Sequence, residues 1–467
     1  MPMRILLQCL ICMLLAAQLS VCRGITYVVL WFDTEDYVDP MSDDAALRIA
    51  NDLTAQGVHA TFKIVGEKAR VLERRGRTDV ISALGRHSIG YHSDWHSVQP
   101  VPAIALWHLG LLEGADEFER LQRGGFEDVG RIFGVTPVCY GQPGSSYAPQ
   151  SNLALRRMGV HVYLDGGNQV GFGEQPIWYG GLLYVYNVGH YQLRSALDHE
   201  ATEEQAFREF DDAAKGLSDK GGGLISIYYH PTEFVHTEFW DAANFSYGAT
   251  RPRDKWVMPK RRSTQDAERC FNILHRYVTH IKQQQDVVFI TANDLLRVYA
   301  NPMPPRVSKA DLARHFSRSI DFLSTKGGDL SPAEILLELL DLPAQYVDGP
   351  TRSGKTNLTD SVIPDYLYQA AVGDVKAFIK KNKRLPSEVF VGAKTLSLED
   401  FAATVAAHVL APGPVHVKTG RIEFGKYFSK DARSSFNWPI HPKGFAPEEL
   451  LVLARLQGWT LKPARLR

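Results

Sequence analysis

Short apolar runs alternate with longer amphipathic stretches over residues 25–300. The runs at 25–32 (ITYVVLWF) and 221–231 (GGGLISIYYHP) are almost continuous in hydrophobic residues, a pattern typical of strands buried on both faces of a parallel sheet. The stretches at 43–57 and 266–284 carry apolar residues at helical spacing, and the glycine-rich stretch at 114–134 predicts a helix in two pieces. We therefore predict an α/β fold, in which the ends of strands carry function.

The pattern changes near residue 300. The segment 301–308 (NPMPPRVS) is typical of a linker, and most of the following stretches are helical in pattern. One of them begins with Ser331 as N-cap, Pro332 in the first turn and Glu334 completing a capping box. We predict a smaller, mostly helical C-terminal domain over residues 301–467.

Size and charge narrow the function classes. The chain has 467 residues, 45% of them hydrophobic, which suffices for two packed domains. Lysine plus arginine and aspartate plus glutamate number 52 each. This balance gives no indication of a nucleic-acid partner or of electrostatic binding to an anionic membrane.

The first 24 residues resemble a secretory signal peptide. A short positive start precedes an uncharged apolar run, and small residues follow it. We therefore expect a protein that is secreted or held in the cell envelope. Two alternatives stay open. One is a membrane anchor, although the apolar run is short for a transmembrane helix. The other is lipoprotein processing at 19–22 (LSVC), although Val21 is a poor residue just before the cysteine of such a site.

The cysteines do not predict a disulfide framework or a metal site. Three of the five lie in or beside the predicted signal peptide, and only Cys139 and Cys270 are clearly outside it. These two could pair, but we favour two buried, unpaired thiols.

The clearest chemical signal is a group of acids where an apolar strand ends. The segment 31–37 (WFDTEDY) places Asp33, Glu35 and Asp36 within four positions. Downstream, His92 and His96 are four residues apart, a spacing that shares one face on a helical turn. Two imidazoles and a carboxylate suit catalytic zinc or a related divalent metal. Taken alone, the histidine pair would also fit exposed or core positions.

Four segments of the sequence follow one another in the order of the motifs of a known enzyme family. They are 31–36 (WFDTED), 57–69 (GVHATFKIVGEKA), 85–96 (GRHSIGYHSDWH) and 226–231 (SIYYHP). Together they resemble the NodB-type polysaccharide deacetylases, carbohydrate esterase family four, over residues 25–300. The resemblance implies a distorted (β/α) barrel and metal-dependent removal of N-acetyl groups from a polysaccharide or cell-wall glycan.

The resemblance also implies roles for single residues. Asp33 matches the base that takes a proton from the attacking water, and His92 and His96 match the metal histidines. His230 matches the acid that protonates the leaving amine, a step suited to a group that titrates near neutrality. Asp165 lies where a carboxylate orienting this histidine is expected, or it is a surface-loop acid.

In this family the metal carboxylate follows the base by one or two positions. Residues i and i+2 of a strand point the same way, so we predict Glu35 as the ligand and keep Asp36 as the fallback. Gly144 is expected to offer a backbone N–H to the oxyanion.

One position departs from the family pattern. The third motif usually carries an arginine two residues before a proline, where it holds the catalytic aspartate. Here the segment 139–149 (CYGQPGSSYAP) has Gly141 at that position. We expect another group, such as Arg86 or Arg156, to hold the aspartate. The alternative is a changed substrate or lost activity.

Two further patterns concern the C-terminal region. Residues 349–356 (GPTRSGKT) satisfy the phosphate-binding-loop pattern, but the segment before them is a poor strand and Pro364 interrupts the helix that should follow. We predict no nucleotide binding. Residues 370–409 resemble cell-wall-binding repeats of the pseudomurein-binding type, or form a helical domain that merely packs on the barrel.

The sequence thus predicts a secreted N-deacetylase with a divalent metal, most simply zinc. The alternative is a catalytically silent NodB-like scaffold that binds glycan. Such a scaffold would be expected to have lost Asp33 or His230, and both are present. The oligomeric state and the glycan are left open.

Overall fold

A computed structural model describes residues 24–300, 305–359 and 361–467. The predicted signal peptide, with its three cysteines, lies outside these residues except for Gly24. In the ranges that are described, no helix combines the length and the apolar character needed to cross a membrane. Cys139 and Cys270 are both buried and unpaired, as predicted.

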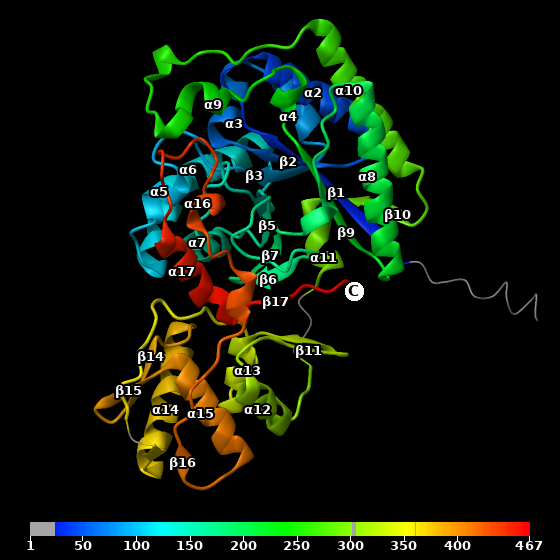
Figure 1. The fold of residues 1–467 in the computed structure, drawn as a ribbon. Coiled ribbons are helices and arrows are strands. Elements are labelled where there is room, and N and C mark those ends of the chain that lie inside the picture. The colour runs from blue at the N-terminus through cyan, green and yellow to red at the C-terminus, as the bar shows by residue number, and fades with distance from the viewer. Residues whose placement is uncertain (1–23, 301–304, 360) are drawn as a thin grey trace, which may run out of the picture.

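The larger unit is built on one curled sheet of 11 strands (Figure 1). Its strands are β1 (Thr26–Thr34), β2 (Thr61–Ile64), β3 (Ser88–Tyr91), β4 (Cys139–Tyr140), β5 (Val162–Leu164), β6 (Ile177–Tyr179), β7 (Leu182–Val185), β8 (Gln192–Leu193), β9 (Gly223–Tyr229), β10 (Val287–Ile290) and β17 (Lys462–Pro463).

Most pairs in this sheet are parallel, in the order β7-β5-β4-β3-β2-β1-β9-β8. Strand β1 is central: it pairs with β9 along most of its length, with β10 over its first half and with β2 over its second half. Strands β6 and β17 add an antiparallel edge. The arrangement is a distorted (β/α) barrel, as predicted.

Helices cover this sheet between the strands. They are α2 (Met41–Ala55), α3 (Gly66–Arg74), α4 (Thr78–Leu84), α5 (Pro102–Leu106), α6 (Leu111–Phe133), α7 (Gln150–Arg157), α8 (Glu200–Asp219), α9 (Trp240–Phe245), α10 (Thr264–Lys282) and α11 (Ala292–Val298). Their buried faces are apolar, as in α10, where Cys270, Ile273, Tyr277 and Ile281 are all buried.

The prediction of a broken helix at 114–134 is wrong. Helix α6 runs without interruption through Gly124 and Gly125. A Cβ at Gly125 would lie 2.4 Å from the carboxylate of Asp94, so this glycine lets the loop that carries Asp94 approach the helix closely and does not end the helix.

The smaller unit lies below the barrel in Figure 1 and is mostly helical. Its elements are α12 (Lys309–Arg318), β11 (Leu323–Thr325), β12 (Gly328–Leu330), α13 (Pro332–Leu339), β13 (Val362–Ile363), α14 (Asp365–Asn382), β14 (Glu388–Val391), β15 (Lys394–Ser397), α15 (Leu398–Leu410) and β16 (Val415–His416). Ser331 caps α13 in a capping box with Glu334, as predicted.

After this unit the chain returns to the barrel. Helices α16 (Ala432–Ser435) and α17 (Glu448–Leu456) lie against it, and β17 pairs with β6 (Figure 1). A buried ion pair joins Lys462 of β17 to Glu334 of α13, with Nζ–Oε distances of 2.8 and 2.9 Å. The predicted boundary at residue 300 stays a prediction, but the larger unit includes residues from both sides of it.

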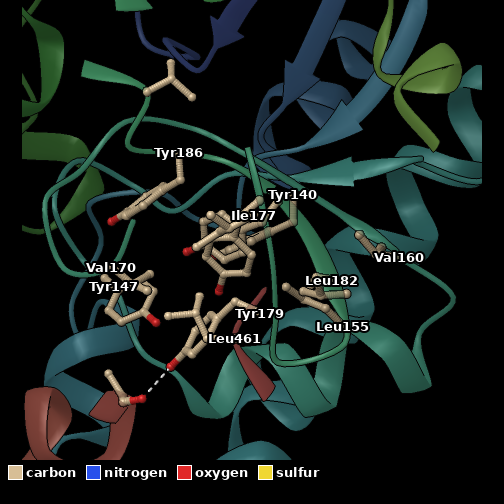
Figure 2. Close-up of a cluster of buried hydrophobic side chains, with 14 of the residues drawn as sticks. Tyr140, Tyr147, Leu155, Val160, Val170, Ile177, Tyr179, Leu182, Tyr186 and Leu461 are labelled. Atoms are coloured by element: carbon tan, nitrogen blue, oxygen red, sulfur yellow. Dashed lines mark hydrogen bonds between the residues drawn. The ribbon is translucent and has the colours of Figure 1, made fainter. Parts of the chain in front are cut away.

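A cluster of buried tyrosines anchors this return (Figure 2). Tyr163 and Tyr184 stack with ring centroids 4.4 Å apart, and Tyr179 meets Tyr184 edge-on. The hydroxyl of Tyr179 donates a hydrogen bond of 2.8 Å to the carbonyl of Ala454 in α17. A buried hydroxyl needs such a partner, so the bond fixes α17 on the sheet.

Candidate active site

The predicted site residues meet at the carboxyl ends of neighbouring strands. Asp33 lies near the end of β1 and Glu35 just beyond it, His92 follows β3, and His230 follows β9. Asp33, Glu35 and His92 are each less than 5% exposed. Parallel pairing of β1 with β2 and β9, and of β2 with β3, brings these ends to one edge of the sheet.

Glu35, His92 and His96 form a compact ligand set. One ligand atom from each lies within 4.8 Å of the others. Oε2 of Glu35 is 2.8 Å from Nε2 of His96 and 3.5 Å from Nε2 of His92. The indole N–H of Trp240 donates to the other carboxylate oxygen at 3.1 Å, which directs Oε2 toward the histidines.

The groups that contact the Nδ1 atoms of the two histidines leave their Nε2 atoms available to bind a metal. Nδ1 of His92 lies 3.0 Å from the carbonyl of Gly141, to which it can donate, and Nδ1 of His96 lies 2.6 Å from Oγ of Ser97. Both Nε2 atoms are then left to act as ligands. Nε2 of His96 is buried and makes no hydrogen bond of acceptable geometry within the described residues. A divalent cation would satisfy it, so the residues fit the predicted metal.

The charge of the site favours an ionised ligand carboxylate. Burial acts to raise the pKa of Glu35, but the charges of His96 and His230 and hydrogen bonds from the histidines hold that pKa well below its usual value. Glu35 is therefore a carboxylate at neutral pH, as a metal ligand must be.

The histidines converge through a loop and not through a helical turn. Residues 92–99 contain no helix, and Ser93 and His96 have φ angles of 64° and 52°. Oγ of Ser93 accepts the backbone N–H of His96 at 3.0 Å, which stabilises this conformation. The predicted helical face is wrong, although the predicted pair of histidines does converge.

The fallback ligand Asp36 lies outside the ligand set. Its Oδ1 accepts the backbone N–H groups of Val38 and Asp39 at 2.8 and 3.2 Å, and its Oδ2 contacts the hydroxyl of Ser42. Asp36 thus holds the turn after β1, and the structure favours Glu35.

His230 lies between two carboxylates, those of Asp33 and Glu233. Its Nε2 is 3.7 Å from Oδ2 of Asp33, and its Nδ1 is 2.9 Å from Oε2 of Glu233. Burial acts to lower the pKa of His230, but the charge and hydrogen bond of Glu233, with Glu35 and Asp33, raise it to about 9. The imidazole is therefore protonated at neutral pH, as a general acid must be.

Asp165 does not orient His230 as predicted. Its Oδ2 is 2.8 Å from Nζ of Lys63, and its Oδ1 accepts the backbone N–H of Gly166. Across the described residues, no hydrogen bond or ion pair joins Asp165 to His230; Glu233 takes that place. The signal was present in the sequence, since HPTE places an acid three residues after the histidine.

Lys63 holds Asp33, the predicted base. Its side chain is fully buried, and Nζ lies 2.9 Å from Oδ1 of Asp33 and 2.8 Å from Oδ2 of Asp165. The ammonium also lies 4.1 Å above the ring of Trp31. Burial acts to lower the pKa of Lys63, but the two carboxylates raise it above its usual value. Lys63 is therefore charged and bridges both acids.

Gly141 leaves the space that Lys63 fills. A Cβ at position 141 would lie 2.0 Å from Nζ of Lys63 and 2.2 Å from Oδ2 of Asp165. The missing arginine is thus replaced by a lysine from another strand. The candidates Arg86 and Arg156 are wrong, because they bind Asn51 and Asp348 respectively.

The site opens into a pocket of about 370 Å³. Asp33, His230 and Gly144 line it, together with four residues of the C-terminal region: Ser434, Ser435, Asn437 and Trp438. Gly144 has a φ of 52° beneath Trp438. Its role toward an oxyanion stays a prediction.

The segment 349–356 has no place in this site. It lies in irregular structure, and the next helix in the described residues, α14, begins at Asp365. The prediction against nucleotide binding stays a prediction.

Comparison with known proteins gives structural matches alone. No family model and no curated protein matches the chain. A protein described as a polysaccharide deacetylase from Mycobacterium smegmatis is 15% identical with a TM-score of 0.39, over 59% of this chain and 90% of the other. The peptidoglycan deacetylase PdaC from Bacillus subtilis is 12% identical with a TM-score of 0.29, over 59% and 92%.

The Xyl-CE4 domain of a xylanase from the hindgut metagenome of Trinervitermes trinervoides is 11% identical with a TM-score of 0.31, over 59% of this chain and 91% of the other. These TM-scores lie below 0.5, so the description of the fold and of the candidate site rests on the strand order and on the side chains that converge. The chain has a fold of the distorted (β/α) barrel type and is similar to NodB-type (CE4) polysaccharide deacetylases.

Proposed function

We propose that the protein is a metal-dependent hydrolase that removes N-acetyl groups from an N-acetylated glycan, and that it acts outside the cytoplasm or in the cell envelope. One observation carries the proposal: Asp33 and His230 lie side by side in the lining of one pocket, and the ligand set of Glu35, His92 and His96 lies next to Asp33. The signal-like segment 1–24 supports the location.

Two imidazoles and one carboxylate are typical of catalytic zinc, which leaves an open position for substrate. When bound there, the metal would polarise the acetyl carbonyl and increase the acidity of water. Glu35 supplies negative charge, and the histidines present their Nε2 atoms because their Nδ1 atoms are held by Gly141 and Ser97.

Asp33 acts as the base. Burial acts to raise its pKa, but His92, Lys63 and His230 hold that pKa below its usual value, so Asp33 is ionised and ready to accept a proton. Lys63 fixes Oδ1, which leaves Oδ2 on the side of His230.

His230 acts as the acid. As the C–O bond forms and the C–N bond breaks, Nε2 of His230 gives its proton to the amide nitrogen, because an amide anion is a very poor leaving group. The products are acetate and the free amine of the sugar. Glu233 holds Nδ1 and stabilises the imidazolium form.

The second candidate is a silent scaffold that binds glycan without cutting it. Gly141 in place of arginine favours it. Against it, Asp33 and His230 are retained and Lys63 supplies the missing positive charge.

The test is acetate release by the zinc-loaded protein from chitin oligomers, peptidoglycan and acetylated xylan. We expect release from at least one N-acetylated glycan, and abolition by chelator with recovery on adding zinc. Binding of a glycan without any release would establish the scaffold instead. Release from acetylated xylan alone would make the protein an O-deacetylase and contradict the N-acetyl specificity.

A further inference from the structure

The C-terminal region contributes a wall to the candidate active site. After the smaller unit, the chain returns to the barrel, and Ser434, Ser435, Asn437 and Trp438 line the pocket that contains Asp33 and His230. The placement is fixed from both sides: Gln169 donates to the carbonyl of Ser435 at 2.5 Å, and the backbone N–H of Trp438 donates to Oγ of Ser145 at 2.9 Å.

Trp438 is the main feature of this wall. Its ring lies so close over Gly144 that a Cβ there would be 2.4 Å from Cδ1 of the indole. It meets Phe239 edge-on at 5.7 Å, and Phe239 in turn meets His230 edge-on at 4.9 Å. The indole remains partly exposed and forms part of the pocket lining. A fixed, partly exposed aromatic ring therefore lines the same pocket as His230, with Phe239 between the two rings.

The same pocket offers hydrogen-bonding groups suited to hydroxyls. Asn168 and Asn437 line it, and both are exposed. An amide side chain can donate and accept at once, as a sugar hydroxyl requires. An apolar face with a few polar groups is the usual composition of a small-ligand site. Pyranose rings carry both kinds of surface: C–H groups on their faces and hydroxyls at their edges.

We propose that residues 434–438 form part of the glycan-binding site, with Trp438 as the platform for a pyranose ring next to the acetyl group under attack. The proposal rests on the proposed function, because it takes an N-acetylated glycan as the ligand. It assigns to the C-terminal region a direct share in substrate binding.

Trp438 also makes a hydrogen bond to Asp241, and this bond determines which Trp438 variants can test the proposal. Its Nε1–H donates to Oδ2 of Asp241 at 2.9 Å, and Asp241 lies 3.3 Å from Oγ of Ser97, the partner of His96. Removing the whole side chain would therefore disturb both the platform and the support of a metal ligand. Trp438→Phe keeps an aromatic face, of smaller area, and loses the N–H donor to Asp241.

The experiment compares wild type, Trp438→Ala and Trp438→Phe with penta-N-acetylchitopentaose and soluble peptidoglycan fragments as probes. Binding is measured by calorimetry, acetate release by initial rates, and zinc content by elemental analysis. For Trp438→Ala we expect Kd and KM to rise about five- to tenfold, the range of one aromatic contact. For Trp438→Phe we expect less than about a twofold change. Trp107→Ala, at an exposed tryptophan outside the pocket lining, is the matched control and should leave both values unchanged.

Unchanged Kd and KM in Trp438→Ala would overturn the proposal. Equal losses in both Trp438 variants, with loss of zinc, would also overturn it, because they would assign Trp438 to the support of Asp241. If the wild type binds a probe but releases no acetate, the proposed function fails. A weaker Kd in Trp438→Ala alone would then still establish the platform. Binding of neither probe by the wild type would contradict the platform for these glycans.

Discussion

Nζ of Lys63 lies 2.9 Å from Oδ1 of Asp33, and the two residues face each other across the parallel pair β1–β2. The same ammonium lies 2.8 Å from Asp165. One buried cation thus serves two buried carboxylates, and all three side chains are less than 11% exposed. The first prediction follows from this charge balance.

Lys63→Met should destabilise the protein and impair the base. Removing one partner of a buried ion pair costs roughly 3–5 kcal/mol, because the remaining charge is left without compensation. The pKa of Asp33 should rise, since Lys63 is one of the charges that hold it down. Loss of activity on the acid side should therefore begin at a higher pH. Chemical denaturation and the pH dependence of kcat/KM measure the two effects.

Lys63→Arg is the matched control, because it keeps the positive charge beside Asp33 and Asp165. It should retain most of the stability that Lys63→Met loses. Equal stability and equal pH profiles for wild type and Lys63→Met would contradict the role given to this lysine.

The second prediction concerns metal binding. His92→Ala and His96→Ala should each strip the metal, because each removes one of three ligands. Asp36→Asn should retain it, since Asp36 bonds the turn after β1. Zinc content and the zinc dependence of thermal stability provide the readouts. Full occupancy in either histidine variant, or loss in Asp36→Asn alone, would reverse the assignment.

The third prediction concerns the alkaline limb of the pH profile. Burial acts to lower the pKa of His230, and Glu233 is the leading charge that raises it to about 9. A general acid must be protonated, so activity falls as pH rises through this pKa. Glu233→Gln should lower the pKa and shift the alkaline limb to lower pH.

Glu204→Gln serves as the control, because Glu204 is a highly exposed acid on α8. Its pH profile should match that of wild type. An alkaline limb that stays in place in Glu233→Gln would show that another group sets it.

The fourth prediction separates the base from the ligands. Asp33→Asn should keep the metal, because Glu35, His92 and His96 are untouched, and should preserve the pair between Lys63 and Asp165. It should lose about 10²–10⁴-fold in kcat, the usual contribution of a general base. Acetate release and metal content are measured on the same preparation. Near-normal kcat with full metal content would remove Asp33 from the mechanism.

The parts of the site that the sequence predicts are those next to strand ends. Asp33, Glu35, His92 and His230 each follow or end an apolar run, and parallel pairing alone brings them together. The exchange of an arginine for Lys63 could not be predicted, because it depends on the register of β1 against β2 and on the space at Gly141. In the sequence, Lys63 is only a polar residue within an apolar strand.

Trp438 was beyond prediction for a different reason. It is 197 positions from Asp241, to which it donates a hydrogen bond, and no local pattern links two segments so far apart. The resemblance to known deacetylases covers residues 25–300 and therefore implies nothing about this segment. Glu233, by contrast, sits three positions from His230 and could have been found as a capping partner.

The pairing of β17 with β6 has a consequence for synthesis on the ribosome. Lys462 and Pro463 complete one edge of the barrel sheet, yet they follow the whole smaller unit in the chain. Domains usually fold as units while the nascent chain emerges, with N-terminal parts first. Until the smaller unit and the residues after it have been translated, the edge of β6 has no partner strand and the wall around Trp438 is absent. The pocket can therefore be completed only after the smaller unit and the segment that carries Trp438 have been translated.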